Sequence, residues 1–309
     1  MFNSLLIVLL AVGNAAPPSM LPPTSVPLQA GDRIRVRHEA GLATITGGAG
    51  KTLDIELPAN RRDLHVRRVE PHIVEVTTNG PVALRVPRSA SVESISSERA
   101  SVNIRGVRTV NVQAASGNVR VEEVEGNVDA RLGSANLTLR AIGGNVVAST
   151  GSGNLSADGV GGLVDVTTGN GNMTIANVRN GVHVISINGR TEISCAAGAI
   201  DVKDTSGRVT IRNAAEDVDI FTALGQAFYE GALKPDRSYR LRTLDGSVTL
   251  TYAANSAGFT GRVASDASKQ PREDIRVGDQ SARVVLDAVG GKVALLKSDK
   301  TAAGCREVK

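Results

Sequence analysis

Aromatic residues, cysteines and an excess of one charge are all scarce in this chain. The aromatic fraction is 2% and there is no tryptophan. Because Cys195 and Cys305 are the only cysteines, a disulfide framework is excluded and at most one internal bridge is possible. We expect Cys195 to be a small buried filler and Cys305 to be free on a mobile tail. Lys and Arg number 35 and Asp and Glu 31, a balance that argues against a dedicated nucleic-acid binder.

Long hydrophobic runs are missing outside the N-terminus. The apolar run from Leu5 to Val12, followed by small residues at Ala15 and Ala16, predicts a secretory signal peptide over residues 1–16. A proline-rich linker is expected over 17–30. No later segment of the sequence is long and apolar enough to span a bilayer. The sequence therefore predicts a secreted, periplasmic or cell-surface protein with no transmembrane segment after signal removal.

Motifs for catalysis and metal binding are also lacking. There is no G-x-S-x-G, H-E-x-x-H or C-x-x-C sequence. The segment "ITGGAGKT", residues 45–52, ends like a phosphate-binding loop, but Ile45 replaces its first glycine and the strand-like "LDIELP" follows. We expect a hairpin turn there. In a calcium-binding nonapeptide array, acidic ligands would stand where this chain has glycine. We predict no catalytic residue, no metal and no cofactor.

Basic side chains gather in "RRDLHVRR", which contains Arg61, Arg62, Arg67 and Arg68. These arginines could face an anionic surface such as lipid headgroups, but we favour a solvated strand face. We likewise expect the histidines, including His183, to be solvated.

A repeat of nine residues dominates the middle of the sequence. Steps of nine from Val119 reach Val218 through apolar residues with the single exception of Thr191, and the row two residues further on is apolar throughout. The residues between the two rows are nearly all polar, so each unit predicts a short half-buried strand. Corner residues recur every eighteen, as Gly117, Ala135, Gly153, Gly171, Gly189 and Gly207 on one side and Val124, Ile142, Val160 and Val178 on the other.

Two unlike strands and two unlike corners predict an all-β fold, a single-chain β-solenoid (β-helix) with eighteen-residue coils of two short strands. Glycine suits the tight corner because it has no Cβ. Asn118, Asn136, Asn154 and Asn172 occupy one position in successive coils, so we expect their side-chain amides to form a ladder.

The flanking regions lack this regularity. We expect a β-rich N-terminal cap over 31–100, the regular β-solenoid over 101–224, irregular C-terminal coils and a cap over 225–297, and a mobile tail over 298–309. The nine-residue spacing is lost after Phe221.

Residues from about Asp32 to Lys297 resemble a known family, through "VALRVPRSASVESISSERASVNIRGV", "ASGNVRV", "TSGRVTI" and "LRTLDGSVTLTY". The chain is similar to the bacterial β-strand-repeat domain of unknown function that is labelled putative adhesin, the domain-of-unknown-function 4097 type. The resemblance implies an exported or surface-held β-helix and supplies no catalytic residues.

These features predict a non-catalytic binding, adhesin-like or structural module at the bacterial cell envelope, with an unknown envelope or extracellular protein or polymer as partner. The alternatives are a polysaccharide-active β-helix enzyme of the pectin-lyase type and an ice-binding or polymer-binding solenoid. Binding candidates lie where the aromatic residues cluster: Phe228, Tyr229, Arg237, Tyr239 and Arg240. Because terminal coils need caps, we favour a buried cap role for the rings over contact with a partner.

Overall fold

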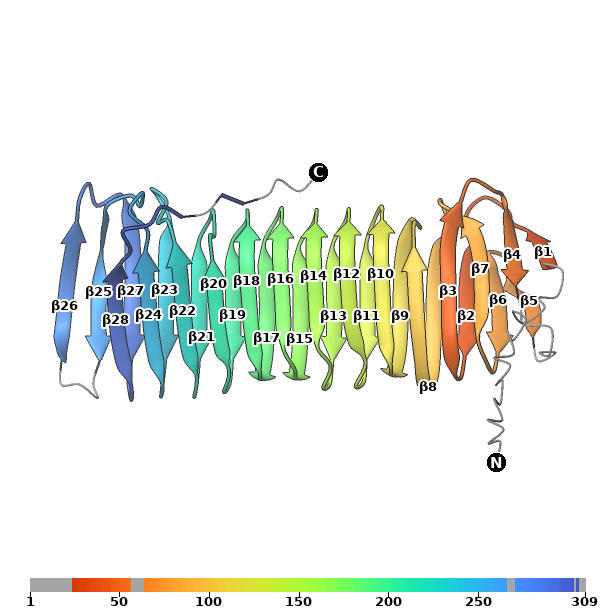
Figure 1. The fold of residues 1–309 in the computed structure, drawn as a ribbon, viewed down its shortest axis with the longest axis horizontal. Coiled ribbons are helices and arrows are strands. Elements are labelled where there is room, and N and C mark those ends of the chain that lie inside the picture. The colour runs from red at the N-terminus through yellow and green to blue at the C-terminus, as the bar shows by residue number, and fades with distance from the viewer. Residues whose placement is uncertain (1–23, 57–63, 266–269, 303, 306–309) are drawn as a thin grey trace, which may run out of the picture.

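The computed structural model describes residues 24–56, 64–265, 270–302, 304 and 305. They form twenty-eight strands and no helix, which confirms the predicted all-β fold. The strands stand side by side in one long row (Figure 1). The predicted signal peptide and residues 17–23 of the linker lie outside the described residues. Within the described part of the chain, no helix has the length and apolar character to cross a membrane.

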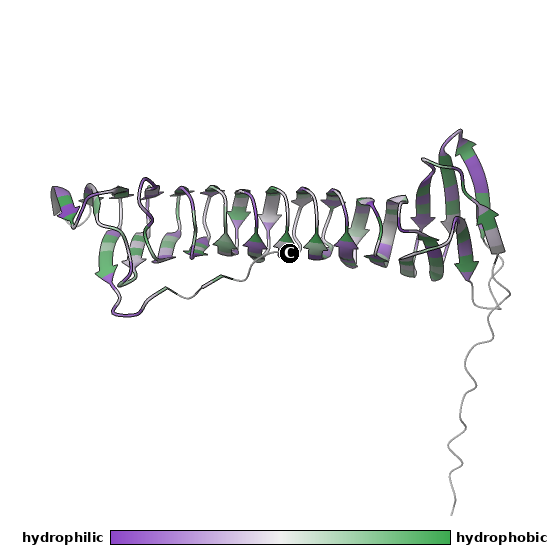
Figure 2. Ribbon diagram, turned by 90° about the horizontal axis from the view of Figure 1, so that it is seen from above, coloured by the Kyte–Doolittle hydropathy of each residue, from purple (hydrophilic) through white to green (hydrophobic). Residues whose placement is uncertain are grey.

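The strands form two layers, which Figure 2 shows from above. In spatial order, the first layer contains β1 (Thr24–Pro27), β4 (Thr52–Glu56), β7 (Val82–Pro87), β3 (Gly41–Gly48), β8 (Ser91–Arg105), β10 (Asn118–Val124), β12 (Asn136–Ile142), β14 (Leu155–Val160), β16 (Met173–Val178), β18 (Arg190–Ala196), β20 (Arg208–Arg212), β22 (Gln226–Gly231), β24 (Ser247–Tyr252) and β28 (Lys292–Lys297).

The second layer contains β5 (His65–Glu70), β6 (Ile73–Thr78), β2 (Arg33–His38), β8, β9 (Thr109–Ser116), β11 (Val128–Leu132), β13 (Val146–Thr150), β15 (Val164–Asn170), β17 (Val182–Asn188), β19 (Ile200–Asp204), β21 (Val218–Thr222), β23 (Ser238–Thr243), β27 (Ala282–Ala288), β25 (Phe259–Ser265) and β26 (Gln270–Val277). Strand β8 pairs in both layers and joins them into one hydrogen-bonded system.

Parallel pairing with the strand eighteen residues further on links the central strands. Val119 pairs with Leu137 in the first layer, and Val128 pairs with Val146 in the second. We call one passage of the chain through both layers a coil. Each coil lies about 4.8 Å from the next, and the inward rows of Val, Ile and Leu are buried between the layers.

A residue with positive φ recurs near the end of the first-layer strands from β10 to β22. This residue is left out of the strand register: in β10, Glu122 pairs with Arg140 and Val124 pairs with Ile142, and Glu123 lies between them. The change of backbone direction at this residue turns the following side chain inward, so Val124, Ile142, Val160 and Val178 are buried, as their spacing predicted. The positive-φ positions, with angles from 54° to 156°, are Glu123, Ala141, Gly159, Asn177, Cys195, Asn213 and Gly231.

The glycine corners stack directly on one another. A Cβ on Gly171 would lie 2.2 Å from the Gly153 carbonyl oxygen, and φ at Gly171 is +149°. Beside this corner the predicted asparagine ladder is present in altered form. Only Asn136 bonds side chain to side chain, from Nδ2 to Asn118 Oδ1 at 3.1 Å. The Oδ1 atoms of Asn136 and Asn154 instead accept the next coil's backbone N–H, at 3.0 and 2.9 Å. The ladder thus satisfies the first amides of successive strands.

Buried hydroxyls line the inner edge of the glycine corners. Thr150 Oγ1 accepts the N–H of Gly153, three residues on, at 3.2 Å, and Thr222 Oγ1 donates to Thr243 at 3.1 Å. We call this set the hydroxyl row. It comprises Thr150, Thr168, Ser186, Asp204, Thr222 and Thr243, each at most 7% exposed.

Asp204 is the one carboxylate in the hydroxyl row. It accepts hydrogen bonds from Ser186 Oγ and from the N–H of Gly207. Burial raises its pKa, and these two hydrogen bonds only partly offset the effect. Because the folded pKa is raised, the ionised form costs stability, and this cost appears as the pH rises through the folded pKa.

We therefore expect Asp204→Thr to stabilise the protein by about 1 kcal/mol at pH 7. The gain should shrink towards zero below the ordinary aspartate pKa of 3.8, because the wild-type carboxyl is then protonated in both folded and unfolded chains. Urea unfolding over this pH range measures it. The control is Asp201→Thr on the same strand, where the side chain is partly exposed, so that no burial cost is relieved and no gain in stability is expected. A gain that is constant with pH would contradict this account.

Both ends of the row of coils carry antiparallel strands. At the N-terminal end β1 pairs with β4 and β5 with β6, and at the C-terminal end β25 pairs with β26. Strand β1 corrects the linker prediction for Thr24–Pro27; proline is tolerated in it because it is an edge strand. The hairpin predicted at residues 45–52 is also wrong. That segment joins β3 to β4, but both strands pair with β7 rather than with each other.

The eighteen-residue spacing continues beyond Phe221, where the sequence predicted a break. Strand β22 pairs with β20 in the same register, Ala227 beside Val209 and Tyr229 beside Ile211. The spacing first changes in the corner after Gly231, where Val218 of β21 pairs with Tyr239. The two inward positions of β22 hold a small alanine, Ala227, and a large tyrosine, Tyr229, so the repeat was not recognised there in the sequence.

The prediction that both cysteines are unpaired is wrong. Cys195 forms a disulfide with Cys305, with the Cα atoms 5.4 Å apart and a sequence separation of 110. The described part of the tail returns along the coils from β28 to Cys195 of β18 (Figure 1). It is also bonded to the body by Ala254 N–H to Lys300 O at 3.1 Å and by Ala302 N–H to Asn255 Oδ1 at 3.1 Å. The described tail residues form a strap over the C-terminal coils.

Candidate functional site

Two of the five predicted binding residues are core residues. Tyr229 and Tyr239 are 1% and 0% exposed, and their ring centroids lie 5.0 Å apart. The Tyr229 hydroxyl donates to Ala232 O at 3.2 Å, and the Tyr239 hydroxyl accepts the N–H of Lys234 at 2.9 Å. Burial raises the pKa of both phenols. These rings support the enlarged corner between β22 and β23 and cannot contact a partner in the folded protein.

The other three candidates lie on opposite faces. Phe228 is half-buried on the outer face of the first layer, with the Arg208 guanidinium 5.1 Å from its ring centroid. Arg237 and Arg240 belong to the second-layer side, where they pair with Glu216 at 2.7 Å and Asp219 at 3.1 Å. The structure therefore does not bring the five residues into one site.

The two adjacent rings make a sharp test of this arrangement. We expect Tyr229→Ala to lower the free energy of unfolding by 3 kcal/mol or more, at about the cost of removing a buried aromatic ring. Phe228→Ala should cost about 1 kcal/mol or less, because one side of that ring faces solvent. Chemical denaturation of both variants measures the difference. Equal losses would show that the inward and outward assignments of β22 are wrong.

A groove runs along the first layer beside the glycine corners. It has a volume of about 990 Å³ and is lined by β16, β18, β20, β22 and the corner before β24. Gly189, Gly207 and Gly225 line it without side chains, while Arg190, Arg208 and Leu224 flank it. Leu224 is 63% exposed. We call this surface the corner groove.

Arg190 and Arg208 are site residues that sequence reasoning missed. They continue the register row of the asparagine ladder, since Asn172 Oδ1 accepts the Arg190 N–H at 3.1 Å and Arg190 pairs with Arg208. Arg208 Nε donates to Gln226 Oε1 at 2.9 Å. The available signal was the change from Asn to Arg at eighteen-residue spacing, from Asn172 to Arg190 and Arg208.

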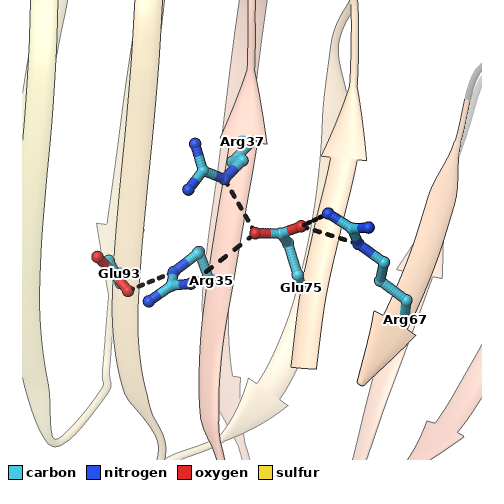
Figure 3. Close-up of polar contacts among 5 residues, drawn as sticks. All are labelled: Arg35, Arg37, Arg67, Glu75 and Glu93. Atoms are coloured by element: carbon cyan, nitrogen blue, oxygen red, sulfur yellow. Dashed lines mark hydrogen bonds and ion pairs between the residues drawn. The ribbon is translucent and has the colours of Figure 1, made fainter. Parts of the chain in front are cut away.

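A second charged cluster occupies the N-terminal end of the second layer (Figure 3). Glu75, only 3% exposed, accepts Arg67 Nη2 at 2.8 Å and Arg37 Nε at 2.9 Å. Arg35 Nε donates to Glu93 at 2.7 Å. Hydrogen bonds from Arg67 and then Arg37 lower the pKa of Glu75. Each of the three arginines has a carboxylate partner in the cluster, so the three arginines and two glutamates together keep a net charge of only +1.

The remaining arginines of "RRDLHVRR" fit the same pattern. Arg68 binds both carboxylate oxygens of Asp32, at 2.8 and 2.7 Å, and this contact is the main cause that lowers the pKa of Asp32 to about 2. Arg61 and Arg62 lie outside the described residues. Arg67 and Arg68 are both exposed on β5, in agreement with the predicted solvated strand face, and both also pair with carboxylates.

Among the described residues, no group of three or more His, Cys, Asp or Glu side chains could hold a metal ion. His183 lies between two carboxylates of neighbouring coils, with Nδ1 2.9 Å from Asp165 and Nε2 3.7 Å from Asp201. It therefore lies in a row of close polar contacts on the second layer.

Comparison with known proteins shows what this architecture resembles. No curated protein matches the sequence. Two solved structures are similar: a putative cell adhesion protein from Clostridium sporogenes ATCC 15579, with 10% identity, a TM-score of 0.24 and coverage of 91% of this chain and 100% of that chain, and a putative adhesin from Bacteroides fragilis NCTC 9343, with 12% identity, a TM-score of 0.31 and coverage of 91% and 99%. The family model "Toastrack DUF4097" matches residues 25–284. With its long parallel stack of strands and this match over most of its length, the chain belongs to the Toastrack DUF4097 family.

Proposed function

We propose that the protein is an exported, non-catalytic binding module of the cell envelope, built as a single-chain β-solenoid of eighteen-residue coils. The observation that carries this proposal is the corner groove, which crosses five neighbouring coils. Each coil is held by parallel pairing on both sides. A rigid surface of this kind presents side chains at a fixed spacing to an extended partner.

Two further features support export. The apolar run Leu5–Val12 has the form of a signal-peptide core. The disulfide between Cys195 and Cys305 is typical of proteins in oxidising compartments outside the cytosol. Fractionation of cells that express the full chain tests this part, and we expect a shortened, oxidised protein outside the cytosol.

A flat ice-binding face finds no support. Thr138, Ser156 and Thr174 stand in register on the outer face of the first layer, but Glu192 and Phe228 interrupt the same row. The surface is therefore chemically uneven along the stack.

Co-sedimentation with envelope fractions of the source cells tests the binding function. We expect Leu224→Asp, in the corner groove, to weaken binding at least tenfold. The matched control is Val147→Asp on the second layer, where a similarly exposed apolar side chain (50%) is replaced by the same acid and binding should be retained. If the wild-type protein does not sediment with any fraction, or if both variants lose binding equally, the proposal is wrong.

A further inference from the structure

The corner groove has the shape of a site for a polymer. Its lining comes from successive coils, with Asn172 from the loop before β16, Arg190 from β18, Arg208 from β20 and Gln226 from β22. Neighbouring strands are about 4.8 Å apart, so four steps along the stack span roughly 20 Å. A ligand that fills this groove is elongated and lies across the strands.

Two arginines, Arg190 and Arg208, and one carboxylate, Glu192, line the groove, so its charge is net positive. Arg208 is exposed, stacks on Phe228 and donates to the neutral Gln226, and among the described residues no carboxylate lies within ion-pair distance of it. Arg190 reaches only Glu192, at 3.8 Å. By contrast, Arg212 at the far end of β20 pairs with Glu230 at 3.3 Å. Arg208 therefore offers a planar, pre-oriented donor for an acidic group.

The remaining lining favours sugars over a peptide. Thr174, Ser206 and Gln226 present hydroxyl and amide groups and Glu192 a carboxylate, and Phe228, outside this lining, carries the Arg208 guanidinium over its ring on the same strand as Gln226. The strands beneath the groove use their backbone hydrogen bonds on both sides, β20 with β18 and β22. A peptide could not add to a free strand edge there, whereas a glycan binds through its hydroxyls and its apolar ring faces.

We propose that the corner groove binds an acidic polysaccharide laid along the stack, with Arg208 and Arg190 facing acid groups and Phe228 packing on a sugar ring. This inference rests on the proposed binding function and names the class of its ligand.

Titration with defined oligosaccharides tests the proposal. The probes are hexasaccharides of galacturonate, mannuronate and the hyaluronan repeat, with cellohexaose as the neutral sugar and polyglutamate and polyphosphate as acids without sugars. We expect saturable calorimetric binding of at least one uronate probe, at least tenfold tighter than cellohexaose and than either sugar-free polyanion. Failure of all three uronates to bind, or equal binding of the neutral or sugar-free probes, would overturn the proposal.

Variants locate the site. Arg208→Gln should weaken uronate binding at least tenfold and Phe228→Ala several-fold, while Arg212→Gln, on the same strand and face, should change it less than twofold. All three side chains are at least partly exposed, and melting curves confirm that each variant is folded. An effect of Arg212→Gln equal to that of Arg208→Gln would also overturn the assignment. Loss of envelope binding in Leu224→Asp together with no uronate binding would refute the polysaccharide class but leave the binding module standing.

Discussion

Deletion of Gly153–Asn170 should leave a folded protein that is one coil shorter. The deleted segment is eighteen residues long, so Gly171 takes the place of Gly153 above Ala135 and every strand keeps a partner of its own layer. Stability in stacked repeats is roughly a sum over neighbours. We therefore expect a cooperative melt only a few degrees below that of the wild type.

Deletion of the nine residues Gly153–Gly161 should destabilise the protein far more than the eighteen-residue deletion. It brings Gly162 and Leu163, from the other corner, into the place of the glycine corner and puts the second-layer strand β15 where the first-layer strand β14 belongs. The hydroxyl row and the left-handed positions then fall out of register together. We expect loss of the cooperative transition or of soluble protein. Equal melting temperatures for the two deletions, measured by circular dichroism, would refute the eighteen-residue coil.

Loss of the disulfide should destabilise the C-terminal coils strongly. The bridge closes a loop of 110 residues, and the chain-entropy model assigns about 4.7 kcal/mol to a loop near that length. We expect Cys305→Ser to lower the free energy of unfolding by about 2–5 kcal/mol. Because the strap crosses only the C-terminal coils, hydrogen exchange should rise first in β22, β24 and β28.

The other cysteine provides a graded comparison. Cys195 has φ of 57° and stands between Asn177 and Asn213 in the row of left-handed positions. Asparagine tolerates this conformation better than most residues. Cys195→Asn should therefore lose less stability than Cys305→Ser, by about 0.5–1 kcal/mol. Reductant should lower the stability of the wild type and leave both variants unchanged. A wild type that is insensitive to reductant would show that the bridge adds nothing to stability.

The regular coils were largely predictable because their signals are local and periodic. Val124 and Asn136 recur with their equivalents at a fixed spacing. Val124 fills the inside of a corner, and Asn136 accepts a hydrogen bond from a backbone N–H. The repeat was lost at Ala227 and Tyr229 because both are unusual in size for their row. The register of the strand is set by its backbone pairing, so these two side chains of unusual size did not change it.

The candidate site was harder to predict, because it arises from stacking. Gly207 and Leu224 acquire a common role only when successive corners lie on one another, and Arg208 is notable only because it has no acidic partner. For Tyr229 and Tyr239 the error was the opposite one, because the sequence offered them as binding candidates and the structure buries them. Aromatic clustering in the sequence did not show which rings point inward. The pairing of Cys195 with Cys305 depends on a tail that returns along the body, and no local pattern encodes such a path.

The parallel register also bears on how such a protein changes over generations. A duplicated or lost gene segment that encodes one coil inserts or removes a complete structural unit, and both ends of the molecule keep their sequences. Because the corner groove lies along the stack, the same event lengthens or shortens it by one step. Where such an event falls among the coils of the groove, the length of the molecule and the length of the groove change together, and on the proposed polysaccharide binding such relatives should differ in the length of polymer that they hold.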